Sequence, residues 1–104
     1  MAMLNIHIEG GKPRKARIRY MFEYRGERWA IHISHLQKHR LVVTHIETGL
    51  SALRTDRYSG MYSTAKPVER SNQSVIDEFT RTLDKVRDER FRAVIDAGRS
   101  KVTA

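Results

Sequence analysis

Residues 16–33 read ARIRYMFEYRGERWAIHI, and apolar and polar side chains alternate through most of this stretch. Successive side chains of a strand point to opposite faces, so the alternation predicts two strands, each with one apolar and one mostly polar face. Arg25-Gly26 lies between them, and glycine at the second turn position suits the positive φ of a type I′ turn. The stretch therefore predicts a β-hairpin.

The length of the turn fixes the expected register of this hairpin. With two residues in the turn, Phe22 lies opposite Trp29 and Glu23 lies opposite Arg28. Apolar residues then meet apolar residues on one face, and opposite charges meet on the other, which a slip by one residue would abolish. The other expected pairs are Tyr24–Glu27, Tyr20–Ile31 and Ile18–Ile33.

Further β-segments are expected on both sides of the hairpin. Residues 4–8 alternate Leu and Ile with polar residues, and residues 40–46 and 50–54 are two more β-rich runs. Residues 47–49, Glu-Thr-Gly, have the composition of a hairpin loop with glycine in the left-handed position. Residues 55–72 show no regular period, which predicts a long loop.

The C-terminal part of the chain has the spacing of a helix over about residues 74–97. Ser74, with Asp77 three residues later, fits an N-cap, and Gly98 is a natural stop before a short tail to residue 104. Apolar residues recur every three or four positions at Ile76, Phe79, Leu83, Val86, Phe91, Val94 and Ile95.

Together these segments predict an α+β fold in a single domain over residues 1–104. An antiparallel sheet of four to five strands, built from consecutive hairpins within residues 3–54, is expected to pack on one face against a single long C-terminal helix. A chain of 104 residues is too short for two separate cores.

The composition excludes some classes of site. The chain has no cysteine, which excludes disulfides, thiolate metal sites and a cysteine nucleophile. No apolar run approaches the roughly 18 residues that span a bilayer, and the first residues lack the pattern of a signal peptide. We expect a cytoplasmic protein.

The positive charge is strong and unevenly distributed. The formal net charge is +8, and residues 11–45 hold nine Lys or Arg against two Glu, whereas residues 71–97 hold five against six acids. A concentrated positive field attracts polyanions, so the pattern favours DNA or RNA as the partner. A basic protein with no such partner is the alternative.

Two groups of residues are candidates for the interface with nucleic acid. The polar face of the central hairpin and its flanks supply Lys15, Arg17, Arg19, Arg28, His32, Lys38 and Arg40. The returning strand and the long loop interleave cations with aromatics at Arg54, Arg57, Tyr58 and Tyr62. Phosphates bind such cations, and bases stack on tyrosines. The alternatives are an ordinary solvated strand face, a protein-binding loop, and tyrosines that cover the edge of the core.

Metal binding and catalysis have little support. His32, His35 and His39 are close in the sequence, but their spacing matches no zinc module, and we expect no metal and no cofactor. The chain contains no phosphate-binding glycine loop, no HExxH and no GxSxG. We therefore expect a binding protein and not an enzyme, with a small nuclease as a minor alternative.

The leading hypothesis is a non-enzymatic nucleic-acid-binding protein that contacts the phosphate backbone. The alternative is a small protein-binding modulator or inhibitor that docks on a larger protein assembly, for example one that handles nucleic acid. A homodimer is compatible with both hypotheses. Phe91, Val94 and Ile95 drift away from the stripe that contains Phe79 and Leu83, which predicts contact with a second chain.

Overall fold

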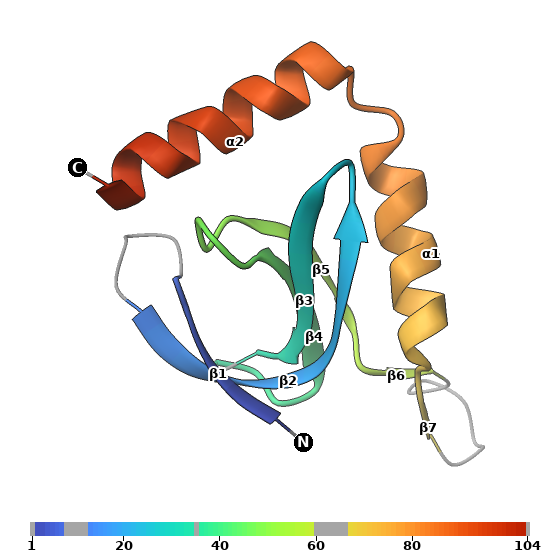
Figure 1. Ribbon diagram of the computed structural model, residues 1–104. Helices are drawn as coiled ribbons and strands as arrows, with labels where there is room; N and C mark the ends of the chain where they lie inside the picture. The colour runs from blue at the N-terminus through green and yellow to red at the C-terminus, as the bar shows by residue number, and fades with distance from the viewer. Residues whose placement is uncertain (1, 8–12, 35, 60–66, 104) are drawn as a thin grey trace.

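The computed structural model describes residues 2–7, 13–34, 36–59 and 67–103. Its main element is a five-stranded antiparallel sheet in which every strand lies beside its neighbour in the sequence (Figure 1). The strands are β1 (Ala2–His7), β2 (Pro13–Tyr24), β3 (Glu27–Ile33), β4 (Arg40–His45) and β5 (Ser51–Asp56). The predicted α+β class and the sheet of consecutive hairpins are confirmed.

The turn between β2 and β3 has the predicted form. Arg25 and Gly26 both have positive φ, 52° and 74°, as a type I′ turn requires. Phe22 pairs with Trp29 and Glu23 with Arg28, and the expected pairs Tyr24–Glu27 and Tyr20–Ile31 are also present. Gly49, in the loop after β4, has the predicted left-handed conformation with φ 76°.

The pairing predicted for Ile18 is wrong. The register shifts between Ile18 and Tyr20, as at a β-bulge, so that Ile18 pairs with His32 and not with Ile33. Ile18 therefore lies on the face of the sheet away from the helices, where it packs with Ala30 and Ile46 and is 4% exposed. One extra residue in β2 has exchanged the two faces of the strand.

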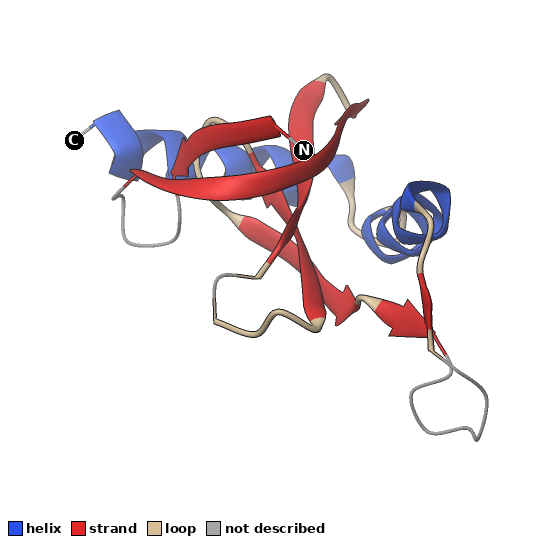
Figure 2. Cartoon of the chain, turned by 90° about the horizontal axis from the view of Figure 1, so that it is seen from below, coloured by secondary structure: helices blue, strands red, loops and turns tan. Residues whose placement is uncertain are grey.

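Both faces of the central strands are buried. Trp29 and Ile31 face the helices, whereas Ala30, Val42 and Thr44 are buried on the opposite face. Figure 2 shows β1 and β2 as a curved pair that crosses over the other three strands. The sheet bends sharply along β2, and the opposite face is not the open surface that the alternation predicted.

The predicted single helix is two helices, α1 (Asn72–Leu83) and α2 (Asp88–Thr103). The N-cap is Ser71, whose hydroxyl accepts a hydrogen bond from the amide of Ser74 at 3.1 Å, so the expected cap at Ser74 is also wrong. The turn between the helices receives hydrogen bonds from the β2–β3 hairpin. Tyr24 donates to Asp84 and Arg25 donates to the carbonyl of Val86, at 2.5 and 2.9 Å.

The core lies between the helices and the sheet. Phe79 of α1 packs edge-on against Phe22 and Tyr24, with ring centroids 5.2 Å apart in each pair, and 5.0 Å from Trp29. Phe91 of α2 lies 6.1 Å from the Trp29 ring. Each helix thus contributes an aromatic side chain to the same tryptophan.

Two of the three expected dimer contacts, Phe91 and Ile95, belong to the core of the chain itself. Phe91 and Ile95 are 5% and 1% exposed inside the core of their own chain, because the turn after α1 directs the apolar side of α2 back onto the sheet. Val94 is 41% exposed and borders an apolar pocket of about 250 Å³ between α2 and the start of β5. The homodimer stays a prediction, and Val94 is the expected contact that remains accessible.

Gly98 does not end the helix. A Cβ atom at Gly98 would lie 3.1 Å from the Cβ of Thr48, so glycine allows α2 to approach the β4–β5 loop closely.

The segment predicted as a long loop contains a second, two-stranded sheet of β6 (Tyr58–Ser59) and β7 (Val68–Glu69). In the described part of the chain, no helix is both long and apolar enough to cross a membrane.

Candidate functional site

Four of the predicted phosphate-binding cations lie at one end of strands β4 and β5. Arg57 donates to the carbonyl of Lys38 at 3.0 Å, and its amide donates to the carbonyl of His39 at 2.9 Å. Arg40 of β4 pairs with Asp56 of β5, and Arg54 lies two residues before Asp56 on β5. We call Lys38, Arg40, Arg54 and Arg57 the basic end of the sheet.

The basic end keeps a surplus of positive charge after its internal ion pairs are counted. Arg40 lies 3.5 Å from Asp56, and Arg57 lies 2.8 Å from Glu69. The hydrogen bond from Arg57 is the main reason why the pKa of Glu69 is below its usual value. Lys38 and Arg54 are exposed and make no ion pair with any described residue.

An aromatic ring accompanies these cations. The guanidinium of Arg57 lies 5.2 Å from the centroid of the Tyr58 ring, within the range of a cation–π contact. Tyr58 is half-buried at the start of β6. Tyr62 lies outside the described residues, so of the two predicted tyrosines only Tyr58 is placed beside the basic end.

The expected basic face on the central hairpin does not form. The register shift at Arg19 places Ile18 on the face of the sheet away from the helices, which is also the face of Arg28. Arg17 and Arg19, on either side of Ile18, therefore do not share a face with Arg28. Arg19 donates to the carbonyl of Arg70 at 2.6 Å, so its guanidinium serves the fold.

His32 is buried as well, and its Nε2 lies 2.7 Å from the hydroxyl of Thr44. Neither Arg19 nor His32 is therefore available to a phosphate backbone in the way the alternation predicted. Arg17 and Arg28 are exposed, but Arg28 lies near the start of β3, at the other end of the sheet, and Arg17 lies on β2, two strands away from β4. Lys15 lies in β2 opposite Asn5.

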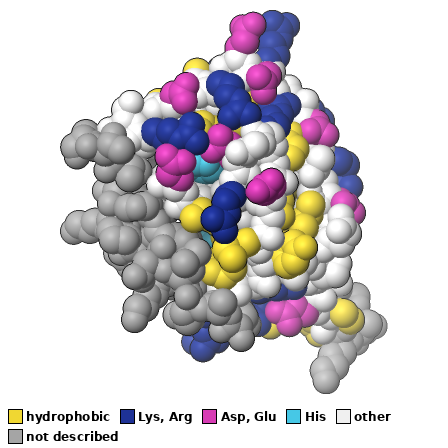
Figure 3. Space-filling view, in the orientation of Figure 1, with side chains coloured by type: hydrophobic (Ala, Val, Ile, Leu, Met, Phe, Trp, Pro, Cys, Tyr) yellow, Lys and Arg dark blue, Asp and Glu magenta, His cyan; other side chains and the backbone are white. Residues whose placement is uncertain are grey.

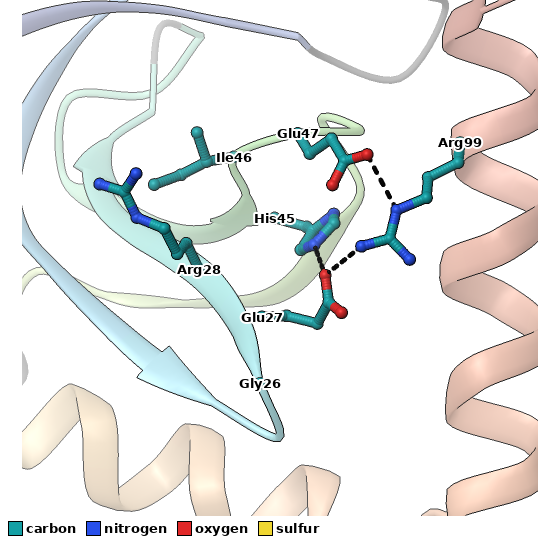
Figure 4. Close-up of a pocket in the computed structure, with 7 residues that line it drawn as sticks. All are labelled: Gly26, Glu27, Arg28, His45, Ile46, Glu47 and Arg99. Atoms are coloured by element: carbon teal, nitrogen blue, oxygen red, sulfur yellow. Dashed lines mark hydrogen bonds and ion pairs between the residues drawn. The ribbon is translucent and has the colours of Figure 1, made fainter.

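A second cluster, missed in the sequence, surrounds the buried carboxylate of Glu27 (Figure 4). Glu27 is the first residue of β3, His45 is the last residue of β4, and Glu47 lies in the loop that follows. Arg92 and Arg99 are seven residues apart on α2, which is two helical turns, and so they share one face of that helix.

The side chains of this cluster converge on Glu27. Its Oε1 lies 2.8 Å from His45 Nε2 and 2.6 Å from a terminal nitrogen of Arg99, while its Oε2 lies 2.9 Å from Arg92. Arg99 also donates from Nε to Glu47 at 2.8 Å. A buried carboxylate thus has three charge-assisted partners, two of them from α2.

His45 is fixed from both of its ring nitrogens. Its Nδ1 lies 2.7 Å from the Thr48 hydroxyl, and its ring lies 5.0 Å from the ring of Trp29. The imidazole is 1% exposed and therefore has no freedom to turn away from Glu27.

The charges of the cluster shift in the directions that its contacts dictate. Burial alone would raise the pKa of Glu27, but the hydrogen bonds from His45 and Arg99 outweigh it and lower that pKa below its ordinary value. The hydrogen bond from Arg99 also lowers the pKa of Glu47. Both carboxylates are therefore ionised at neutral pH.

The cluster borders an open pocket of about 320 Å³, which is also lined by Gly26, Arg28 and Ile46. One ligand atom each from Glu27, His45 and Glu47 lies within 4.8 Å of the others. Sequence spacing gave no sign of this cluster, because its members come from three separate segments. The sole clue was the predicted strand pairing, which brings the start of β3 beside the end of β4.

The charge on α2 differs from that at the basic end. On the face seen in Figure 3, acidic and basic side chains are interspersed over α2, so this face of the helix has no surface of a single sign. A comparison with known protein families found no match, and neither did searches of curated proteins and of solved structures.

Proposed function

We propose that this chain binds DNA or RNA without catalysing a reaction, and that the basic end of the sheet contacts the phosphate backbone. The observation that carries the proposal is the exposure of Lys38 and Arg54 without a carboxylate partner among the described residues. Exposed cations beside a net positive surface are the usual contacts to phosphates, which supply most of the affinity of non-specific binding.

The charge distribution along the chain supports the same surface. The six acids of residues 1–70 oppose thirteen Lys or Arg, whereas residues 71–104 are nearly balanced, with seven Lys or Arg against six acids. Of the described acids in the sheet half, Glu27, Glu47, Asp56 and Glu69 are already engaged by arginines. The surplus positive charge is therefore not neutralised within the chain.

Tyr58 and Arg57 add a contact for bases. A half-buried tyrosine with a guanidinium near its ring gives a flat surface on which an unpaired base can stack, beside the exposed cations Lys38 and Arg54. This pairing favours single strands over duplexes. The absence of cysteine is compatible with the cytoplasm as the compartment of this activity.

The test is fluorescence anisotropy with labelled single- and double-stranded DNA and RNA at two salt concentrations. The double variant Lys38→Ala/Arg54→Ala should weaken binding and make the logarithmic salt slope less steep. Two lost phosphate contacts correspond to a change of about 1.4 in the slope for a single strand.

The matched control is Arg81→Ala/Lys85→Ala, which removes the same charge from exposed residues at and just beyond the far end of α1. It should leave the slope nearly unchanged. Equal weakening by both double variants, or binding that does not respond to salt, would reject the basic end as the interface. If no oligonucleotide binds, the protein-binding alternative replaces the proposal, and a pull-down from nuclease-treated lysate tests it.

A further inference from the structure

We propose that Glu27, His45 and Glu47 form a binding site for a divalent transition-metal ion, Zn²⁺, at the position that the Arg99 guanidinium occupies. The site is independent of the nucleic-acid interface, from which it is separated along the length of β4: His45 ends the strand that Arg40 begins. Its three ligands come from β3, β4 and the loop after β4, and sheet pairing fixes Glu27 on β3 and His45 on β4.

The geometry needs only a small contraction. One oxygen from each carboxylate and one imidazole nitrogen lie within 4.8 Å of one another. Ligand atoms around a tetrahedral zinc, with bonds of about 2.0–2.2 Å, are roughly 3.4 Å apart. Glu47 is exposed and lies in a loop, so it is the ligand able to close the remaining gap, while Glu27 and His45 are already in place.

Arg99 marks the position that a cation takes. It contacts Glu27 at 2.6 Å and Glu47 at 2.8 Å, and so it bridges the two carboxylates that the metal would bridge. Its side chain is about one-third exposed, which gives the guanidinium a route into solvent. A divalent ion balances both carboxylates, and Arg92 remains on the other oxygen of Glu27.

The surroundings of His45 suit a metal ligand. A zinc-bound imidazole is neutral and donates its second N–H to an acceptor that fixes the ring. Thr48 stands at this position, 2.7 Å from Nδ1, and a hydroxyl can either donate to that nitrogen or accept from it. His45 is therefore able to change from donating through Nε2 to Glu27 to donating through Nδ1 to Thr48, which frees Nε2 for the metal.

The ligand set selects the ion. One imidazole with two carboxylates suits zinc, whereas magnesium and calcium prefer oxygen ligands alone. Three protein ligands in a pocket of about 320 Å³ also leave room for a fourth position open to water.

The test is isothermal titration of the full chain with ZnCl₂ at neutral pH. We expect one Zn²⁺ per chain in the wild type. The variants His45→Gln and Glu47→Gln should abolish measurable binding, and Thr48→Val should weaken it by about tenfold through the ring orientation. Glu47 is exposed, so we expect Glu47→Gln to fold even if the variants at the buried residues His45 and Thr48 do not.

The most informative variant is Arg99→Ala. It should raise the affinity for Zn²⁺ roughly tenfold, because two ion pairs no longer compete with the metal. The matched control is Arg90→Ala, which removes the same charge from an exposed position on α2 and should leave the affinity unchanged.

A purely structural role for Arg99 predicts a loss of stability without any gain in metal binding. The proposal fails if neither the wild type nor Arg99→Ala binds Zn²⁺. It also fails if binding persists in folded Glu47→Gln and His45→Gln, since exposed histidines such as His39 would then be the ligands.

Discussion

Replacement of Glu27 by glutamine tests how strongly α2 is attached to the sheet. Glu27 is 7% exposed and is the shared acceptor for His45, Arg92 and Arg99. Glutamine keeps the shape of the side chain but removes its charge, and its amide nitrogen must face at least one of these donors. The variant therefore weakens both ion pairs to α2 at once.

The magnitude follows from the exposure of the partners. Hydrogen bonds to a charged group contribute about 1.5–3 kcal/mol each when they are buried. Arg92 and Arg99 are 41% and 36% exposed, so water replaces much of what these ion pairs contribute, and the total loss stays near the lower end of that range. His45 is fully buried, but the glutamine amide can still pair with it after a change of tautomer. We expect a loss of about 2 kcal/mol in the free energy of unfolding, or roughly 10 °C in Tm.

The assay is urea denaturation followed by circular dichroism, with Glu23→Gln as the control. Glu23 is an exposed carboxylate on the same hairpin and forms no ion pair with a described residue, so its replacement should cost less than about 0.5 kcal/mol. A loss below that value for Glu27→Gln, or equal losses for the two variants, would refute the assignment of Glu27 as the attachment point of α2.

The same pair of variants gives a pH dependence. The pKa of Glu27 in the folded chain lies below its ordinary value of 4.5. Its stabilising contribution is therefore complete above that value and disappears as the pH falls through the lower, folded pKa. The difference between wild type and Glu27→Gln should be constant from pH 6 to 7 and should shrink on acidification below about pH 4. A difference that grows on acidification would contradict this sign.

Two further variants test the packing and the turn. Phe91→Ala should cost about 3–5 kcal/mol of stability in thermal melts, because the ring is buried against Trp29. Val94→Ser should cost less than about 1 kcal/mol, because Val94 is exposed. In light scattering, Val94→Ser should also shift the predicted homodimer toward monomer. Gly26→Ala should cost about 1–2 kcal/mol in urea denaturation, because φ at this position is +74°, and no loss would mean that the turn is not of type I′.

The sequence predicted most of the sheet because its strands carry local signals. Alternation, the Arg25-Gly26 turn and the loop at residues 47–49 together set the order and most of the pairing. It did not predict the shift at Arg19, because Arg17-Ile18-Arg19 alternates correctly in either register. Whether Ile18 points to one face or the other depends on what covers that face, which is a tertiary property.

The break between the helices escaped prediction for a related reason. Residues 84–87 contain neither proline nor glycine, so no helix breaker interrupts the periodicity. The turn is stabilised by Tyr24 and Arg25, which lie some 60 residues earlier in the sequence. A single-helix prediction then placed Phe91 and Ile95 on the wrong side, and the expected dimer surface followed from that error.

The arginines of this chain show why the formal charge does not by itself identify the exposed, unpaired cations. A guanidinium has five donors in a fixed plane, and it stabilises a small domain by binding backbone carbonyls as readily as carboxylates. Arg19, Arg25 and Arg70 are used in this way, each donating to at least one carbonyl of a distant segment. The formal charge therefore overstates what is available to a partner. The cations that we propose to contact nucleic acid are those that make no such internal hydrogen bond or ion pair with a described residue, and at the basic end of the sheet these are Lys38 and Arg54.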